Sequence, residues 1–199
     1  MQKERIIQAS TEEFMRLGVK SVSMDDISSK LGISKKTLYK AVENKEDLVT
    51  QSIATFLRLE RQLIENIAAN ANDAIHEMIQ IGEHRVMTLR NMKPSVVHDL
   101  KKYYKKVWDM IKQFGDEEFG SILIKNIEKG IKEGLYRPEI NPTIITKLFR
   151  VKSWSIVDET NFSISEYRPD ELIREHLLYH LYGILSDKGK EHLKKYELF

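Results

Sequence analysis

The sequence has no cysteine, and only four of its 199 residues are proline. Without cysteine there can be no disulfide, no cysteine-ligated zinc site and no thiol nucleophile. No apolar run approaches the ~18 residues that a membrane span requires, and the charged N-terminal segment lacks the apolar core of a signal peptide. We therefore expect a cytoplasmic protein with no membrane partner.

The charge balance is nearly even, with a formal net charge of +2, so the chain as a whole does not resemble a strongly basic nucleic-acid binder. Any basic site has to be local. The composition, 41% hydrophobic and 31% charged, allows a buried core and shows no bias toward disorder.

Apolar residues recur every three or four positions almost throughout, which predicts an all-α protein of about nine helices with no convincing strand. Three short helices precede longer and more aromatic ones. We expect an N-terminal domain at residues 1–47 and a C-terminal helical domain at residues 48–199. The nine helices are expected near residues 3–17, 23–31, 34–41, 44–70, 73–90, 94–114, 116–133, 142–159 and 170–186.

The stretch from Leu31 to Leu48, LGISKKTLYKAVENKEDL, has the features of a helix-turn-helix. Gly32 permits the left-handed backbone of the turn, and Ser34 is a favoured N-cap for the second helix. The second helix of such a motif lies in the DNA major groove and uses residues near its N-terminus. The exposed candidates there are Lys35, Lys36, Thr37, Tyr39 and Lys40.

Positive charge is concentrated at this motif: the window from Lys30 to Lys45 holds five lysines and one glutamate. Lysines contact guanine edges or phosphates, the threonine methyl can touch thymine, and the tyrosine hydroxyl can reach a phosphate. The alternative is a solvated basic face between two ordinary helices. The combination of glycine turn, serine cap and lysines favours DNA binding over that alternative.

The segment from Arg5 to Ser52 resembles the DNA-binding domain of the TetR family of bacterial transcription regulators. The resemblance rests on the pattern of the first helix up to Gly18, on SMDDISSKLGIS, on TLY in the reading helix and on NKEDL. It implies that Ser23 caps the second helix and contacts a phosphate, and that Tyr39 and Lys45 hold the DNA backbone. Ser34, Lys35, Lys36, Thr37 and Lys40 would face the groove.

One departure from the family pattern follows the reading helix. Ala41 and Val42 stand where the family usually has histidine or tyrosine followed by an aromatic residue. Ala41 removes a phosphate donor, and Val42 is a smaller core residue. The departure leaves the family membership intact but puts the strength of DNA binding in question.

The resemblance further implies a symmetric homodimer held by the last two long helices, and the sequence itself supports such a bundle with apolar stripes there. Ligand pockets between helices are mostly apolar and aromatic. Five aromatic residues could line a pocket for an unknown small-molecule effector, although each could equally be core: Tyr103, Tyr104, Trp108, Phe119 and Trp154.

Catalytic and metal-binding patterns are missing from the sequence. His176 and His180 lie one helical turn apart, but Leu177 stands where zinc proteases have glutamate, so we expect no metal site, no cofactor and no enzyme activity. The sequence predicts a ligand-responsive transcriptional regulator, most simply a repressor, that binds a palindromic double-stranded DNA operator as a homodimer. The alternative is an architectural or protein-interaction factor of the same fold with weak DNA binding.

Overall fold

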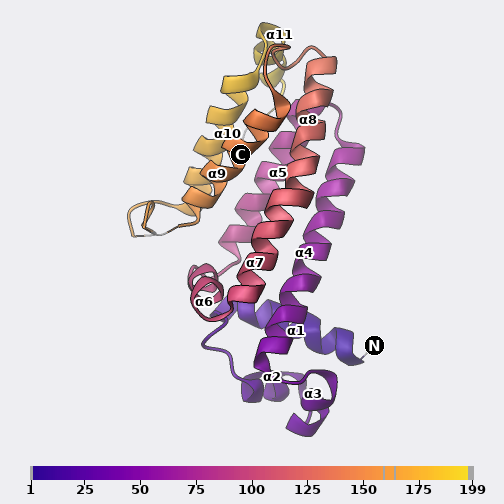
Figure 1. Ribbon diagram of the computed structural model, residues 1–199, viewed down its shortest axis with the longest axis vertical. Coiled ribbons are helices and arrows are strands. Elements are labelled where there is room, and N and C mark those ends of the chain that lie inside the picture. The colour runs from indigo at the N-terminus through magenta and orange to yellow at the C-terminus, as the bar shows by residue number, and fades with distance from the viewer. Residues whose placement is uncertain (1, 159, 164, 197–199) are drawn as a thin grey trace. The chain divides into compact units, whose positions relative to one another are not determined.

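The computed structural model describes residues 2–158, 160–163 and 165–196, and it is all-helical as predicted. In these residues the only β pairing is a single bridge between Tyr136 and Leu185. None of the described helices combines the length and apolar character needed to cross a bilayer. The helices shown in Figure 1 are α1 (Gln2–Leu17), α2 (Met24–Leu31), α3 (Lys35–Ala41), α4 (Lys45–Asn70), α5 (Ala74–Arg90), α6 (Ser95–Tyr103), α7 (Lys105–Gln113), η1 (Phe114–Phe119), α8 (Gly120–Lys132), α9 (Pro142–Ile156), α10 (Pro169–Ile184) and α11 (Asp187–Leu193).

The chain divides into two compact units, and α4 contributes to both. The first unit contains residues 1–60 and 91–114, and the second contains residues 61–90 and 115–199. The first unit therefore includes α6 and α7 as well as the helix-turn-helix. The functional boundary expected after residue 47 remains a prediction.

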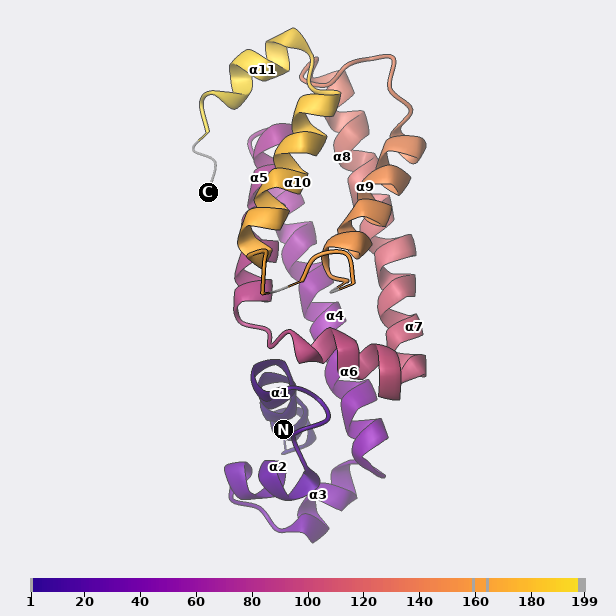
Figure 2. The same cartoon turned by 90° about the vertical axis from the view of Figure 1, so that its left-hand side faces the viewer.

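The first unit is built on one apolar core beneath α1, α2 and α3. Phe14, Ile27 and Leu38 supply one fully buried side chain from each of these helices. Val96 and Leu100 of α6 and Val107 of α7 are buried in the same core. Figure 2 shows the start of α6 close to α1, which agrees with hydrogen bonds from Lys93, just before α6, to Met15 and Leu17 of α1.

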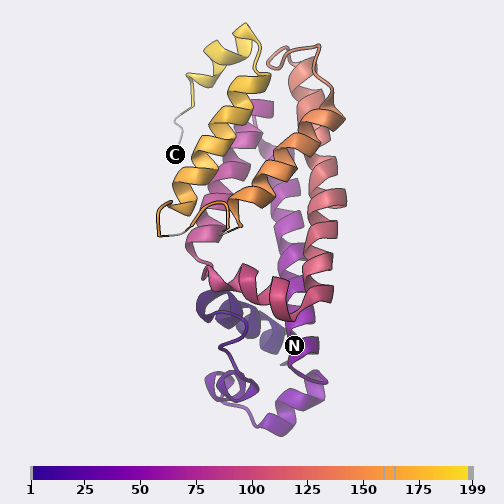
Figure 3. The same ribbon diagram turned by 60° about the vertical axis from the view of Figure 1, so that its left-hand side comes forward.

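The second unit packs α10 against α5 and α9, and α8 against α5 and α9. Figure 3 shows α9 and α10 side by side with α5 next to α10. The fully buried residues Ile75, Leu123, Ile127 and Leu181 form the centre of its core. Tyr136 follows α8 and is also fully buried, and any side chain at Gly130 would overlap its ring.

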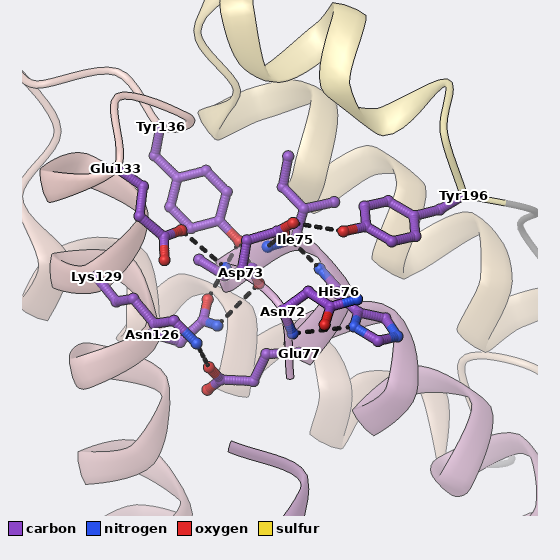
Figure 4. Close-up of polar contacts among 11 residues, drawn as sticks. Asn72, Asp73, Ile75, His76, Glu77, Asn126, Lys129, Glu133, Tyr136 and Tyr196 are labelled. Atoms are coloured by element: carbon purple, nitrogen blue, oxygen red, sulfur yellow. Dashed lines mark hydrogen bonds and ion pairs between the residues drawn. The ribbon is translucent and has the colours of Figure 1, made fainter. Parts of the chain in front are cut away.

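A polar network closes the start of α5 in this unit (Figure 4). Asp73 accepts the backbone N–H groups of Ile75 and His76, both at 2.9 Å, and caps the helix. The other oxygen of Asp73 accepts from Tyr196 and lies 2.8 Å from His192 Nε2. The network thus connects the C-terminal segment to the first turn of α5.

Additional bonds complete this network at the carbonyl of Ala74. Tyr136 Oη donates to that oxygen at 3.0 Å, and Asn126 Nδ2 donates to it at 2.9 Å. Burial raises the pKa of the Tyr136 hydroxyl well above its ordinary value, so it stays a donor at any physiological pH.

Three helical predictions need correction. The helix expected over residues 94–114 is two helices, because the chain breaks at Tyr104 with φ −132° and ψ 59°. The helix expected from residue 116 starts with the π-helix η1, which runs on from α7. The charged C-terminal segment contains α11, where Gly189 and Leu193 are buried. The end of the helix expected near Glu159 lies outside the described residues, and α9 ends at Ile156.

Candidate nucleic-acid interface

The helix-turn-helix begins with a complete capping box at Ser23 and Asp26. Ser23 Oγ accepts the backbone N–H of Asp26 at 3.1 Å, and the Asp26 carboxylate accepts the backbone N–H of Ser23 at 2.8 Å. Gly32 ends α2 with φ 64° and ψ 31°, the left-handed conformation that the turn needs. These local bonds fix the backbone at both ends of α2, which precedes α3 in the chain.

The reading helix α3 is fixed by a cap at its start and an anchor in its middle. Ser34 Oγ accepts the backbone N–H of Thr37 at 3.1 Å, and the hydroxyls of Ser34 and Thr37 lie 2.9 Å apart. Leu38 is completely buried in the first core. The opposite surface of α3 is therefore presented to solvent, with Lys35, Lys36, Tyr39 and Lys40 exposed and Thr37 half-buried.

Lys35 already has a partner on the preceding helix. Its Nζ lies 2.7 Å from Asp25 Oδ2, with both side chains exposed. The hydrogen bond to Asp25 raises the pKa of Lys35, so this lysine stays fully charged. Nothing in the spacing of the residues indicated this pair, which links the two helices of the motif.

Lys45 is placed differently from the exposed lysines of α3. Its Nζ donates to the backbone oxygen of Lys20 at 3.2 Å, in the loop between α1 and α2. Burial lowers the pKa of Lys45, although the carboxylates of Asp99 and Asp26 act in the opposite direction. The expected contact of Lys45 with the DNA backbone remains a prediction.

The two residues that depart from the family pattern pack inward. Val42 is 3% exposed and lies in the first core, and Ala41 packs against the same core. Asn44 then accepts the backbone N–H of Asp47 at 2.9 Å and caps α4. The small side chains therefore leave the end of α3 and the start of α4 intact.

The five aromatic residues predicted for an effector pocket fall into both compact units. Tyr104 and Trp108 are half-buried against the first core, whereas Tyr103 is 44% exposed. Phe119 packs against the second core, and the Trp154 ring would contact any Cβ added to Gly115, at 2.8 Å. Their shared role in a pocket remains a prediction.

Two histidines of α10, His176 and His180, pack against the Phe149 ring of α9. His176 lies on Phe149 with ring centroids 4.5 Å apart and shares a hydrogen bond of 3.0 Å with Ser153 Oγ. Burial lowers the pKa of His176 to about 4 and that of His180 to about 3, so both are neutral at physiological pH. Across the described part of the chain, no group of three or more metal-ligating side chains is arranged to hold an ion.

Comparisons with known proteins identify the family from the N-terminal domain. The sequence model for bacterial regulatory proteins of the tetR family matches residues 6–51, the same segment that folds into α1, α2, α3 and the start of α4. The segment at residues 6–51 is therefore of the TetR DNA-binding type. The chain is a DNA-binding transcription regulator, and its relatives are transcription factors, not enzymes.

Two similar proteins come from Bacillus subtilis (strain 168). The uncharacterized HTH-type transcriptional regulator YvaF is 29% identical over 153 residues, which cover 69% of this chain and 79% of YvaF. The uncharacterized HTH-type transcriptional regulator YhgD is 23% identical over 154 residues, which cover 74% of this chain and 80% of YhgD.

A solved structure shows the same fold over nearly the whole length. A putative transcriptional regulator from Saccharomonospora viridis, crystallised in complex with choline, matches with a TM-score of 0.76 at 18% identity. The match covers 92% of this chain and 97% of that one.

Proposed function

We propose that this protein is a ligand-responsive repressor of the TetR type that binds a palindromic operator as a homodimer. The observation that supports DNA reading is α3 itself, a helix capped by Ser34, anchored by buried Leu38 and basic on its exposed surface. A helix of this kind fits the major groove, where its lysines meet base edges and phosphates.

Separate roles follow for the residues at this surface. The groove-facing set comprises Ser34, Lys35, Lys36, Thr37 and Lys40, and Tyr39 offers its hydroxyl to a phosphate. Ser23 lies at the N-terminus of α2, where the helix dipole favours an anion. Lys45 belongs to the backbone contacts expected for the family.

The exposed apolar side chains of α9 and α10 support a homodimer. Ile144, Leu148 and Val151 follow one another along α9 and are each at least 56% exposed. Tyr179 and Tyr182 of α10 are exposed at 68% and 58%. A cluster of this kind on a water-soluble protein marks an interaction surface, and a second copy would bury it.

The proposed response to a small molecule is supported by the fold and by the aromatic side chains of the chain. The Saccharomonospora viridis structure holds choline, which shows that a protein of this fold binds a small organic ligand. An effector would alter operator affinity only by binding one conformation of the dimer better than the other. Tyr103, Tyr104, Trp108, Phe119 and Trp154 are the proposed aromatic contacts.

Selection of DNA by the purified protein tests the proposal. The full-length chain is incubated with a library of random 40-base-pair duplexes, and recovered sequences are compared after several rounds. We expect an inverted repeat among the recovered sequences. For the selected duplex, log affinity should fall linearly with log salt concentration, with a slope of about −0.9 per phosphate contact. Recovery of no common sequence, with weak and salt-insensitive binding, would support the architectural alternative and refute the regulator.

A further inference from the structure

The backbone of Lys20 is held from both sides by residues that are distant in the sequence. Its N–H donates to Asp99 Oδ2 on α6 at 2.8 Å, and its carbonyl accepts from Lys45 Nζ on α4 at 3.2 Å. Lys20 lies in the loop between α1 and α2. The backbone of one residue therefore joins α6 and α4 to the loop that leads into the helix-turn-helix.

Lys93, just before α6, makes further hydrogen bonds to the end of α1. The backbone N–H of Lys93 donates to the Met15 oxygen at 2.7 Å, and Lys93 Nζ donates to the Leu17 oxygen at 3.1 Å. Gly18 has φ 93°, and a Cβ there would lie 2.6 Å from Ser95 Oγ. A larger residue at Gly18 would therefore be strained by the positive φ and would force Ser95 to shift.

The Asp99 carboxylate and the Lys45 ammonium are both shielded from water to some extent, so the hydrogen bonds that they make to Lys20 are costly to break. Asp99 is only 6% exposed, so its carboxylate depends on the protein for hydrogen bonds. Desolvation lowers the pKa of the partly buried Lys45 ammonium, and Asp99 and Asp26 partly offset this effect. An ammonium in this position is less available to a phosphate than one on the open surface of α3.

We propose that Asp99 and Lys45 are positioning residues for DNA binding, which act by fixing the backbone of Lys20. Ser23, the cap of α2 and a proposed phosphate contact, lies three residues beyond Lys20. Displacing the loop would move the N-terminus of α2 and, with it, the start of the reading motif. This inference rests on the proposed operator binding, and it reassigns Lys45 from a DNA contact to a support of the loop.

Salt dependence separates the two roles of Lys45. The full-length Lys45→Met variant is titrated against the selected duplex by fluorescence anisotropy between 50 and 300 mM salt, with Lys36→Met as the positive control. Loss of a phosphate contact makes the log–log slope shallower by about 0.9 per site, hence by about 1.8 for a dimer on two half-sites. We expect this change for Lys36→Met. For Lys45→Met we expect about tenfold weaker binding with the wild-type slope, because a hydrogen bond to the loop is lost.

Variants of Asp99 test the hydrogen bond to the backbone N–H of Lys20. Asp99→Asn keeps an oxygen that can accept the Lys20 N–H, so we expect affinity within about threefold of wild type, whereas Asp99→Ala should bind about tenfold more weakly. Asp109→Asn removes the same charge from a half-buried position on α7, where Asp109 pairs with Lys105, and should leave affinity unchanged. Hydrogen exchange reports the bond directly, and the Lys20 amide should exchange faster in Asp99→Ala than in Asp99→Asn.

Two results would overturn the inference. One is a shallower salt slope for Lys45→Met that matches the slope of Lys36→Met. The other is an Asp99→Ala protein in which the Lys20 amide exchanges faster while operator affinity stays at the wild-type value. Failure of the wild-type chain to select any duplex would instead refute the proposed function, so the two failures are distinguishable.

Discussion

Lys35 and Asp25 form an ion pair across the helix-turn-helix, with 2.7 Å between Nζ and Oδ2. The pair places a carboxylate on the surface that is proposed to meet DNA, and it occupies a lysine that could otherwise meet a phosphate. In water such an exposed pair contributes little to stability, in the range of about 0–1 kcal/mol. Its effect should therefore be seen in DNA binding more than in folding.

We predict that Asp25→Asn binds the selected duplex more tightly, by roughly two- to fivefold, because it frees Lys35 and removes a negative charge from the interface. The salt dependence should also become steeper. Fluorescence anisotropy at several salt concentrations measures both. Glu128→Gln, an exposed change on α8, controls for the altered net charge. Equal or weaker binding by Asp25→Asn would show that the carboxylate helps to position α3.

Lys36 and Tyr39 should be needed for DNA binding but not for assembly. Both are exposed on α3, and Tyr39 has half of its surface in solvent. Alanine at either position should weaken operator binding by about 1–3 kcal/mol, and Lys36→Ala should also reduce the salt slope by about 1 per contact. Anisotropy measures affinity, and light scattering should give the same mass as wild type. Unaltered binding by both variants would place the reading helix elsewhere.

Gly32 should be required for its backbone conformation alone. It has φ 64°, and a Cβ there would meet nothing within 4 Å. Gly32→Ala should therefore lower the free energy of unfolding by about 1–2 kcal/mol through left-handed strain without any clash. Asn tolerates this region, so Gly32→Asn should cost less. Urea denaturation at one protein concentration compares them, and equal losses in both variants would mean that the strain argument is wrong.

The local part of the fold could be read from the sequence because its determinants lie within a few residues of one another. Ser23 with Asp26, Ser34 with Thr37, and Asn141 with Ile144 are all capping contacts three residues apart. The family model matching residues 6–51 confirms the resemblance that the N-terminal motifs indicated. The predicted DNA-contacting residues lie on the exposed surface of this motif, apart from the half-buried Thr37 and Lys45.

Contacts between distant segments could not be predicted in this way. Asp99 lies 79 residues from Lys20 and belongs to a lysine-rich stretch whose sequence suggests only a solvated surface. The break at Tyr104 interrupts a continuous helical pattern, so packing of Val96 and Val107 into the first core has to impose it. Likewise α11 contains one large apolar side chain, Leu193, and depends on tertiary packing for its position.

The exposed apolar face of α9 gives a prediction for the homodimer. Leu148 is 56% exposed, and a glutamate there would put an uncompensated charge in an apolar interface. Leu148→Glu should therefore shift the protein toward monomer at micromolar concentration. Lys147→Glu is the matched control, because Lys147 is the exposed neighbour on the same helix. Light scattering after size exclusion gives the mass, and a dimeric Leu148→Glu protein would move the proposed interface away from this face.

Acidification should weaken the network at the start of α5. Burial by itself would raise the pKa of Asp73, but hydrogen bonds from Tyr196, the His76 backbone and His192 outweigh it and lower the pKa below its ordinary value. A carboxyl whose folded pKa is lowered stabilises the fold above its unfolded pKa of about 3.9, and that contribution is lost as pH falls through the folded value. Asp73→Asn cannot make this contribution at any pH.

The stability difference between wild type and Asp73→Asn should therefore be largest near neutral pH and shrink as the pH falls below about 4. Urea denaturation at several pH values measures it, with Glu128→Gln as a control for loss of one exposed acid. Tyr196→Phe removes one donor to Asp73, so it should retain part of the same pH dependence. If the difference in unfolding free energy between wild type and Asp73→Asn stays constant from pH 7 to pH 3, the charge of Asp73 does not stabilise α5. Asp73 would then contribute only through its shape and through hydrogen bonds that a neutral side chain can also make.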